Sequence, residues 1–188
     1  MTQPSLPALI LAAGFGHRMG GPKALLTWEG ETLLQRTARV ALAAGCGPVL
    51  AVMGIWDPGF LDPKVQAIAN PFAAEGMASS IRLGVAALPL DADGVLLLTV
   101  DQIRVDEHLL RRLLETHHAA PDRPTVCAYA GTVGIPAVFP RRLFPALLAL
   151  QGDQGAKGIL LREKPATLTF PGGGEDLDTP EDQVSFHP

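Results

Sequence analysis

Two cations and four glycines gather in the stretch LAAGFGHRMGGPKALL, residues 11–26. Gly14 and Gly16 directly follow an apolar run, and Arg18 and Lys23 come after them. A glycine-rich turn after a strand can aim several backbone N–H groups at phosphate oxygens. Arginine can hold two such oxygens in a fork, and lysine supplies a movable point charge. The stretch therefore predicts a site for a phosphate-bearing ligand.

The spacing of this loop differs from two common nucleotide-binding patterns. It is neither the G-x-x-x-x-G-K-[ST] P-loop nor the G-x-G-x-x-G dinucleotide fingerprint. Pro22 also stands where a P-loop needs its helix to begin. The competing interpretation is a surface loop whose cations are merely solvated, and the position directly after a buried strand argues against it.

The elements that must position this loop alternate between strands and helices. Apolar runs indicate strands at residues 8–13, 48–54, 65–70, 94–100, 124–130, 135–139 and 166–170. Helical spacing indicates helices at residues 31–45, 77–88, 106–118, 141–150 and 156–162. This alternation predicts an α/β domain over residues 1–188, with a parallel sheet covered on both faces. Ligands bind beyond the carboxyl ends of the strands in such sheets, so we expect the site residues just after strands.

Bulk composition excludes several classes of protein. Apolar residues make up 47% of the chain and charged residues 18%, which is typical of a soluble globular protein. The formal net charge of −4 disfavours nucleic acid as a partner. The longest apolar runs fall short of the roughly 20 residues that span a membrane. Residues 1–7 do not have the pattern of a secretory signal, so we expect a cytoplasmic protein.

Neither cysteine nor histidine spacing suggests a metal site. Cys46 and Cys127 lie far apart in apolar segments, and we expect two buried free thiols in a reducing compartment. The five histidines show no spacing typical of metal ligands. We expect each to lie on the surface, although His17 belongs to the glycine loop and could face a ligand there.

Five blocks of the sequence carry a resemblance to a known family. They are LAAGFGHRMGGPKALL (11–26), NPFAAEGMASSIRLGV (70–85), TVDQIRVD (99–106), LQGDQGAKGIL (150–160) and DLDTPEDQ (176–183). In this order they resemble the MobA-like nucleotidyltransferases, and most closely the molybdenum cofactor cytidylyltransferases of the MocA type. The resemblance implies a three-layer α/β/α fold with a Rossmann-like, mostly parallel sheet of the nucleotidyltransferase (GT-A-like) type.

The family's activity is the transfer of a nucleotidyl group from a nucleoside triphosphate to a phosphorylated acceptor, with release of pyrophosphate. The resemblance therefore implies transfer of CMP from CTP to molybdopterin, with Mg²⁺ as the cofactor. Phosphoryl chemistry of this kind needs positioned phosphates and neutralised charge. Arg18 and Lys23 suit the side of the departing pyrophosphate, and with Asp101 they are the expected catalytic residues. The expected nucleotide-binding residues are Leu11, Ala12, Ala13, Gly14, Gly16, Arg18, Lys23, Asn70, Gly76, Ser79 and Ser80.

Two aspartates are the expected metal ligands. Asp101 directly follows GVLLLTV (94–100), the most hydrophobic strand, and Mg²⁺ takes one or two carboxylates plus phosphates. The alternative for Asp101 is a turn or helix-capping aspartate. Asp178 is the expected second carboxylate, although its surroundings also read as a helix start, with Thr179 as the cap and Pro180 at the first position.

The remaining blocks predict the two ligand-binding loops. Gly76 would allow close backbone approach, and Ser79 and Ser80 could hydrogen-bond a base, ribose or phosphate or simply cap a helix. The resemblance places Gly152, Asp153 and Lys157 near an anionic acceptor, and an ordinary capping loop is the alternative.

Two positions depart from the family's pattern. Ile103 stands where the branch usually has proline, and Ile135 stands where it usually has a polar residue before proline. Ile135 falls at the expected acceptor side, so two alternatives remain open: a sugar phosphate or other small phosphate as acceptor, and a nucleotide-binding assembly protein without catalysis. A molybdoenzyme that receives the finished cofactor is an implied transient partner.

Overall fold

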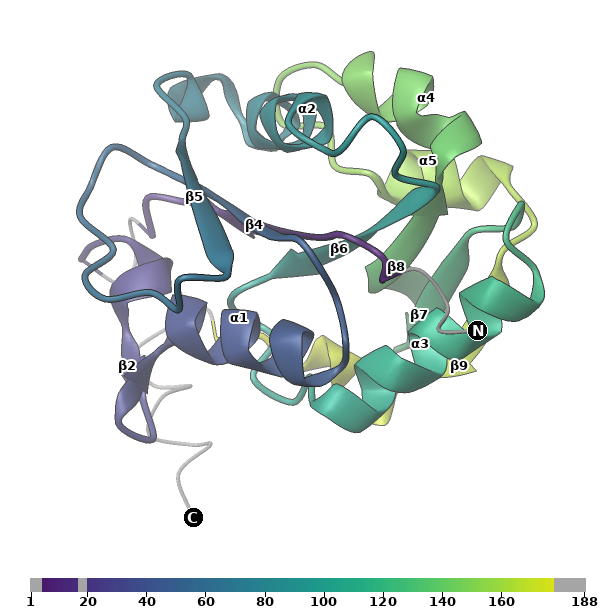
Figure 1. Ribbon diagram of the computed structural model, residues 1–188, viewed down its shortest axis with the longest axis horizontal. Helices are drawn as coiled ribbons and strands as arrows, with labels where there is room; N and C mark the ends of the chain where they lie inside the picture. The colour runs from purple at the N-terminus through teal and green to yellow at the C-terminus, as the bar shows by residue number, and fades with distance from the viewer. Residues whose placement is uncertain (1–4, 17–19, 178–188) are drawn as a thin grey trace.

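A seven-stranded sheet forms the centre of the molecule and lies between two layers of helices (Figure 1). The computed structural model describes residues 5–16 and 20–177. The strands follow the order β5-β4-β1-β6-β8-β7-β9 across the sheet. Their bounds are β1 Ala8–Ala12, β4 Val49–Met53, β5 Val65–Ala69, β6 Gly94–Thr99, β7 Thr125–Tyr129, β8 Thr132–Pro140 and β9 Ala166–Thr169. Strand β8 runs antiparallel to both of its neighbours, and the other pairings are parallel.

Strand β1 lies at the middle of the parallel part of the sheet. It pairs with β4 through Ala8 and Val49 and with β6 through Ala8 and Leu96. All five of its residues are buried, as the unbroken apolar run predicts for a strand covered on both faces. The order reverses around β1, because the chain goes from β1 outward to β4 and β5 and then returns to β6 on the other side. Ligands bind at such switch points in open parallel sheets.

Helices cover both faces, so the expected three-layer fold is confirmed. Helices α1 (Leu33–Ala43) and α3 (Glu107–Ala119) pack on one face, and their leucines join one hydrophobic cluster. Helices α2 (Met77–Ala86), α4 (Phe144–Leu148) and α5 (Lys157–Arg162) pack on the other face around a second cluster. The alternate residues of β1 and β6 point into the two clusters in turn.

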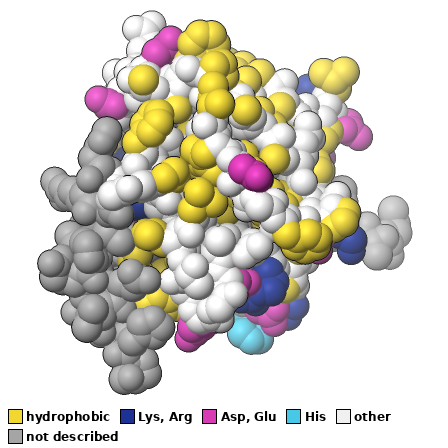
Figure 2. All heavy atoms as spheres, turned by 90° about the vertical axis from the view of Figure 1, so that its left-hand side faces the viewer, with side chains coloured by type: hydrophobic (Ala, Val, Ile, Leu, Met, Phe, Trp, Pro, Cys, Tyr) yellow, Lys and Arg dark blue, Asp and Glu magenta, His cyan; other side chains and the backbone are white. Residues whose placement is uncertain are grey.

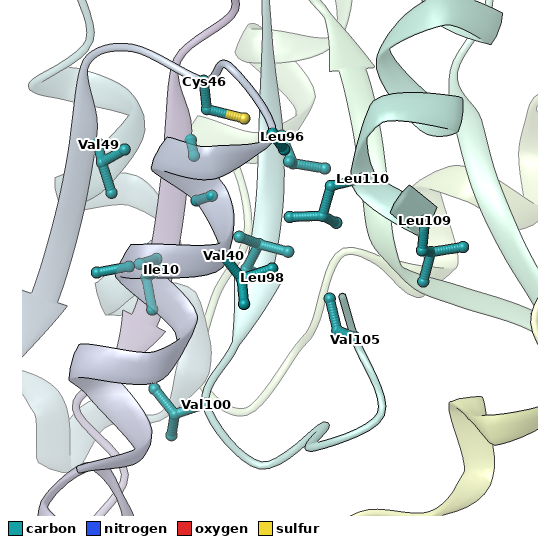
Figure 3. Close-up of a cluster of buried hydrophobic side chains, with 14 of the residues drawn as sticks. Ile10, Val40, Cys46, Val49, Leu96, Leu98, Val100, Val105, Leu109 and Leu110 are labelled. Carbon is teal, nitrogen blue, oxygen red and sulfur yellow. The ribbon is translucent and has the colours of Figure 1, made fainter. Parts of the chain in front are cut away.

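The α1–α3 side shows how this packing fixes the strands (Figure 3). Ile10 and Leu98 project from the sheet toward Val40 of α1 and Leu110 of α3, and all four are buried. Truncating one such leucine to alanine typically costs about 2–5 kcal/mol, because a cavity remains. The tips of β1 and β6 are therefore anchored rigidly.

Local signals set the ends of the helices. Helix α1 begins two residues later than its spacing predicts, because Thr32 caps it. The Thr32 hydroxyl oxygen accepts a hydrogen bond from the Gln35 backbone N–H, and the Gln35 side-chain oxygen accepts one from the Thr32 backbone N–H. The residues just before it form a short hairpin, β2 (Thr27–Trp28) with β3 (Glu31–Thr32), which the sequence pattern did not predict. The helical segment expected at 141–150 is a 3-10 turn followed by the five-residue α4.

Two expectations about single residues have different outcomes. Cys46 and Cys127 are free and buried as expected, and burial raises the pKa of each thiol to about 12. The expectation that the histidines lie on the surface is wrong for His117, which is 2% exposed. His117 stands in the last turn of α3, where its ring packs near Gly94 under the amino end of the sheet. In the part of the chain that the structure describes, no helix is both long and apolar enough to cross a membrane.

Candidate active site

A cleft of about 350 Å³ opens at the carboxyl ends of β1 and β6. Its walls come from the loop after β1, the tip of β6, the start of α2 and the turn at Asp153. The lining residues are Leu11, Ala12, Ala13, Gly14, Phe15, Gly16, Lys23, Ala73, Gly76, Met77, Ser80, Thr99, Val100, Asp101 and Asp153. Figure 2 looks at this side of the molecule, where many hydrophobic side chains are exposed and acidic ones are scattered among them. The cleft lies where parallel-sheet topology predicts a ligand.

The first wall is the backbone that leaves β1. Leu11, Ala12 and Ala13 are buried, while Gly14 is exposed to the cleft. Gly16 has a φ of +54°, and a Cβ there would collide with the carbonyl oxygen of Gly21. The residue must therefore be glycine, and the loop presents backbone to the cleft in place of side chains. Such a loop offers N–H groups to an anion.

Lys23 and Asp101 meet at one edge of the cleft. Lys23 begins a one-turn 3-10 helix, Lys23–Leu25, which the fully buried Ala24 fixes to the core. Its Nζ lies 3.6 Å from Oδ2 of Asp101, and about a fifth to a quarter of each side chain is exposed. A cation and a carboxylate from segments far apart in the sequence thus lie together inside the cleft. This arrangement can hold a phosphate group beside a divalent cation.

Asp101 is held in place by backbone contacts after β6. Its carbonyl oxygen accepts hydrogen bonds from the N–H groups of Ile103 and Leu177, each at 3.0 Å. Its neighbour Gln102 is buried, and the Gln102 amide donates to the carbonyl oxygens of Ile135 (3.1 Å) and Gly173 (3.3 Å). The carboxylate of Asp101 therefore faces the cleft, while hydrogen bonds connect its backbone to Leu177 and its neighbour Gln102 to Ile135 of β8.

The two residues that depart from the family's pattern, Ile103 and Ile135, lie beside these hydrogen bonds of Asp101 and Gln102. Ile103 is buried in the α1–α3 hydrophobic cluster, which explains why an apolar residue is accepted there. The Ile135 carbonyl accepts hydrogen bonds from both Gln102 and the Tyr129 hydroxyl. Burial, and then the charge of Asp176, raise the pKa of Tyr129, so its hydroxyl remains a donor at neutral pH.

The start of α2 divides the residues of the second block. Gly76 and Ser80 line the cleft, but Asn70 and Ser79 do not. The Asn70 amide is buried and donates to the hydroxyl oxygens of Ser79 (2.9 Å) and Ser80 (3.0 Å). Asn70 also accepts from the backbone N–H of Phe72 at 2.9 Å. This network fixes the loop that precedes α2 and orients Ser80.

The third block is divided in the same way. Asp153 lines the cleft, whereas Gly152 and Lys157 do not. The Gly152 carbonyl accepts a hydrogen bond from the Ala78 backbone N–H at 3.1 Å, so the turn is attached to the first turn of α2. Lys157 is exposed at the start of α5.

The donors in this cleft fit a hard divalent cation. Asp101 supplies a carboxylate that is about a quarter exposed, and magnesium commonly takes one or two carboxylates with the substrate's phosphates. Among residues 5–16 and 20–177, no group of three or more acidic, histidine or cysteine side chains could hold a metal by itself. A metal at Asp101 would therefore share its ligands with a bound phosphate. Arg18 and Asp178 lie outside the described residues; Leu177, just before Asp178, is hydrogen-bonded to Asp101.

Sequence reasoning missed several residues that form the apolar part of the cleft. Phe15 and Met77 line it and are about half exposed, and Ala73, Thr99 and Val100 complete it. An aromatic residue between two glycines was a signal for Phe15. Ala73 and Val100 gave no signal, because apolar residues near elements usually join the core.

Comparison with known proteins identifies relatives along nearly the whole chain. Residues 8–167 match the family model of the MobA-like NTP transferase domain. The nicotine blue oxidoreductase of Paenarthrobacter nicotinovorans is 34% identical over 95% of this chain and 94% of its own. The purine catabolism protein PucB of Bacillus subtilis is 30% identical over 97% of this chain and 96% of its own. A probable molybdenum cofactor guanylyltransferase of Synechococcus elongatus is 40% identical over 52% of this chain and 51% of its own.

Solved structures agree with the fold. Rv0371c of Mycobacterium tuberculosis superposes with a TM-score of 0.82 at 30% identity, over 97% of both chains. A structure of Rv0371c in complex with manganese superposes with a TM-score of 0.74 at 28% identity, also over 97% of both chains.

Proposed function

We propose that this protein, which belongs to the MobA-like NTP transferase family, transfers CMP from CTP to molybdopterin and releases pyrophosphate. Membership of this family makes the chain a nucleotidyltransferase. The observation that carries the proposal is the meeting of Lys23 and Asp101 at the tips of β1 and β6. A similarity over about half the chain to a probable molybdenum cofactor guanylyltransferase supports the acceptor class. The choice of cytidine over guanosine rests on the resemblance of the ALILAAG block, residues 8–14, to the cytidylyl branch.

The reaction forms one bond and breaks one at the α-phosphorus of CTP. A phosphate oxygen of molybdopterin attacks it, and the bond to the bridging oxygen of the departing pyrophosphate breaks. Lys23 lies where it can offset the negative charge that grows on this leaving group. The backbone of Gly14 and Gly16 binds the phosphates and keeps the reacting atoms in line. Arg18 belongs to the same loop and is proposed as the second cation.

Asp101 is proposed to hold Mg²⁺, with Asp178 as a second carboxylate. When bound, the metal would polarise the phosphoryl oxygens and neutralise part of their charge. The manganese complex of Rv0371c shows that a similar protein binds a divalent cation. The position of Leu177 against the Asp101 backbone supports Asp178, since that residue is next in the chain.

The acceptor's anionic group is proposed to lie near Gly152 and Lys157. Lys157 is exposed close to the Asp153 turn and forms no salt bridge within the described residues. The finished cofactor would then pass to a molybdoenzyme by transient contact, in the cytoplasm. Nucleic acid and membrane are not proposed as partners, given the acidic net charge.

Pyrophosphate release tests the proposal. The protein is incubated with Mg²⁺, molybdopterin or its molybdenum form, and each of CTP, GTP, ATP and UTP in turn. We expect pyrophosphate with CTP, in an amount equal to the dinucleotide product. A sugar phosphate that reacts while molybdopterin does not would replace the acceptor. Binding of CTP without turnover on any acceptor would instead favour a non-catalytic assembly protein.

The similarity to nicotine blue oxidoreductase favours one second candidate, an oxidoreductase. Such an activity would transfer electrons from a donor to nicotine blue. Bleaching of nicotine blue with equal oxidation of the donor would support this candidate. Loss of that bleaching in Asp101→Asn would place it in the same cleft.

A further inference from the structure

The charges in the cleft are unevenly placed. Three described lining residues carry charge, and two of them, Lys23 and Asp101, largely offset each other at 3.6 Å. The third, Asp153, is exposed, and within the described residues its carboxylate takes part in no hydrogen bond or ion pair. An unpaired carboxylate repels phosphate. Its presence in a triphosphate cleft therefore needs another explanation.

Asp153 is held at a defined place in the cleft. Gly76 has φ +108° and ψ 179°, and a Cβ there would collide with the carbonyl oxygen of Gly152 and with Oδ1 of Asp153. The Gly152 carbonyl also binds the Ala78 N–H. The carboxylate thus lies against the N-terminus of the ten-residue helix α2, where the helix dipole favours a negative charge.

The neighbours of this carboxylate suit a nucleoside better than a phosphate. Met77 and Ala73 offer apolar surface beside it, and the Ser80 hydroxyl lines the same wall. Apolar surface with one fixed carboxylate can hold a base or sugar and accept a hydrogen bond from it. The phosphate-binding features, the glycine loop and Lys23, belong to the other wall.

We infer that Asp153 accepts a hydrogen bond from a donor group of the bound nucleoside, either the ribose 2′-hydroxyl or the exocyclic amino group of the base. Asp153 then determines which nucleotide is bound. It contacts the nucleotide and not the acceptor, near which the family resemblance places it. The inference rests on the proposed function. It also sets the direction of the ligand, with phosphates at the β1 loop and nucleoside at α2.

Binding measurements without acceptor test this assignment. Calorimetry with Mg²⁺ would compare CTP with 2′-deoxy-CTP, which lacks a hydroxyl, and with UTP, which lacks the amino group. If GTP is the preferred triphosphate, deoxy-GTP and ITP take their places. Wild-type protein should prefer the complete nucleotide over one of the two analogues by about 10- to 100-fold, since hydrogen bonds to charged groups are strong. Asp153→Ala should reduce that preference to about twofold or less.

Glu75→Gln is the matched control. Glu75 lies next to Gly76 but pairs with Arg82 outside the cleft. The substitution removes one negative charge, as Asp153→Ala does, and should keep the wild-type preference. Unchanged thermal unfolding would show that both variants fold. A preference that survives Asp153→Ala would overturn the inference, and so would a change confined to the KM of the acceptor. If wild-type protein binds no triphosphate, the proposed function itself fails, and this assignment falls with it.

Discussion

The sheet has a hollow at each end, and the two hollows are similar in size but differ in lining. The one at the carboxyl ends of the strands measures about 350 Å³ and contains Lys23, Asp101 and the glycine loop. The one at the amino ends measures about 390 Å³ and contains His117. Its other lining residues are Ser5, Leu6, Pro7, Gly47, Pro48, Pro89, Asp91, Ala92, Asp93, His118 and Pro121.

The difference shows that volume alone does not identify the site. Proline has no N–H group, so a proline-lined wall offers an anion few donors. Among its described lining residues the amino-end hollow has two aspartates and no lysine or arginine, which also disfavours phosphate. The carboxyl-end cleft has backbone donors, a cation and a carboxylate together. We therefore expect substitutions at the carboxyl end to change turnover and those at the amino end to change stability.

The largest effect should follow loss of the Lys23–Asp101 pair. Lys23→Ala and Asp101→Asn should each lower kcat/KM about 10²- to 10³-fold, because a preorganised charge beside the phosphates is lost. Unfolding free energy should change by less than about 1 kcal/mol, since partly exposed ion pairs contribute little to stability. Pyrophosphate release and urea unfolding measure the two. Lys64→Ala, in an exposed loop before β5, is the control and should alter neither.

Gly76→Ala should affect both stability and turnover. Its backbone conformation is open only to glycine, and a methyl group would push against the Gly152 carbonyl. We expect a loss of about 1–3 kcal/mol in unfolding free energy and a lower affinity for triphosphate. Gly158→Ala lies within α5 with no atom near its Cβ position, so it should leave stability unchanged or raise it. Equal behaviour of the two variants would contradict the proposed role of Gly76.

His117 makes the amino end sensitive to pH. Burial lowers the pKa of His117, although a hydrogen bond with the Arg123 backbone and the charge of Asp93 act in the opposite direction. The unfolded chain therefore takes up a proton below about pH 6.5 that the folded protein does not. Unfolding free energy should fall with decreasing pH, by at most about 1.4 kcal/mol per unit from this group. Urea unfolding between about pH 7 and 5 should show a smaller slope for His117→Gln than for the wild-type protein.

The smallest effect should be on CTP affinity, and it should differ between the neighbouring residues Ser79 and Ser80. Ser80 lines the cleft, whereas Ser79 hydrogen-bonds Asn70 and the Gly76 carbonyl away from it. Ser80→Ala should weaken CTP binding by about 2- to 10-fold, the range of one neutral hydrogen bond. Ser79→Ala should lower stability with little change in affinity. The reverse pattern would remove Ser80 from the nucleotide site.

The same pair shows why sequence predicted one part of the site better than the other. Asp101 was predicted because a charge directly after a buried strand has few structural reasons to be there, and Lys23 because it shares a glycine-rich loop with a second cation. Ser79, Ser80 and Asn70 could not be sorted, because polar residues before a helix also serve as caps and loop braces. Only the three-dimensional path of the loop divides them.

The fold was largely predictable for a similar reason. Unbroken apolar runs and helical spacing indicate buried strands and covering helices over many residues. The β2–β3 hairpin was missed because strands of two residues have no period. His117 was misplaced because a histidine in the last helical turn usually faces solvent, and the sheet end that buries it comes from distant segments.

A crystal structure with Mn²⁺ and a CTP analogue that cannot release pyrophosphate would show directly whether Lys23 and Asp101 bind one triphosphate–metal unit. We expect manganese anomalous density at about 2.0–2.6 Å from a carboxylate oxygen of Asp101, with triphosphate oxygens completing its ligands. Lys23 Nζ should lie within hydrogen-bonding distance of the same triphosphate. Nucleotide density in the amino-end hollow, or manganese bound without Asp101, would contradict it.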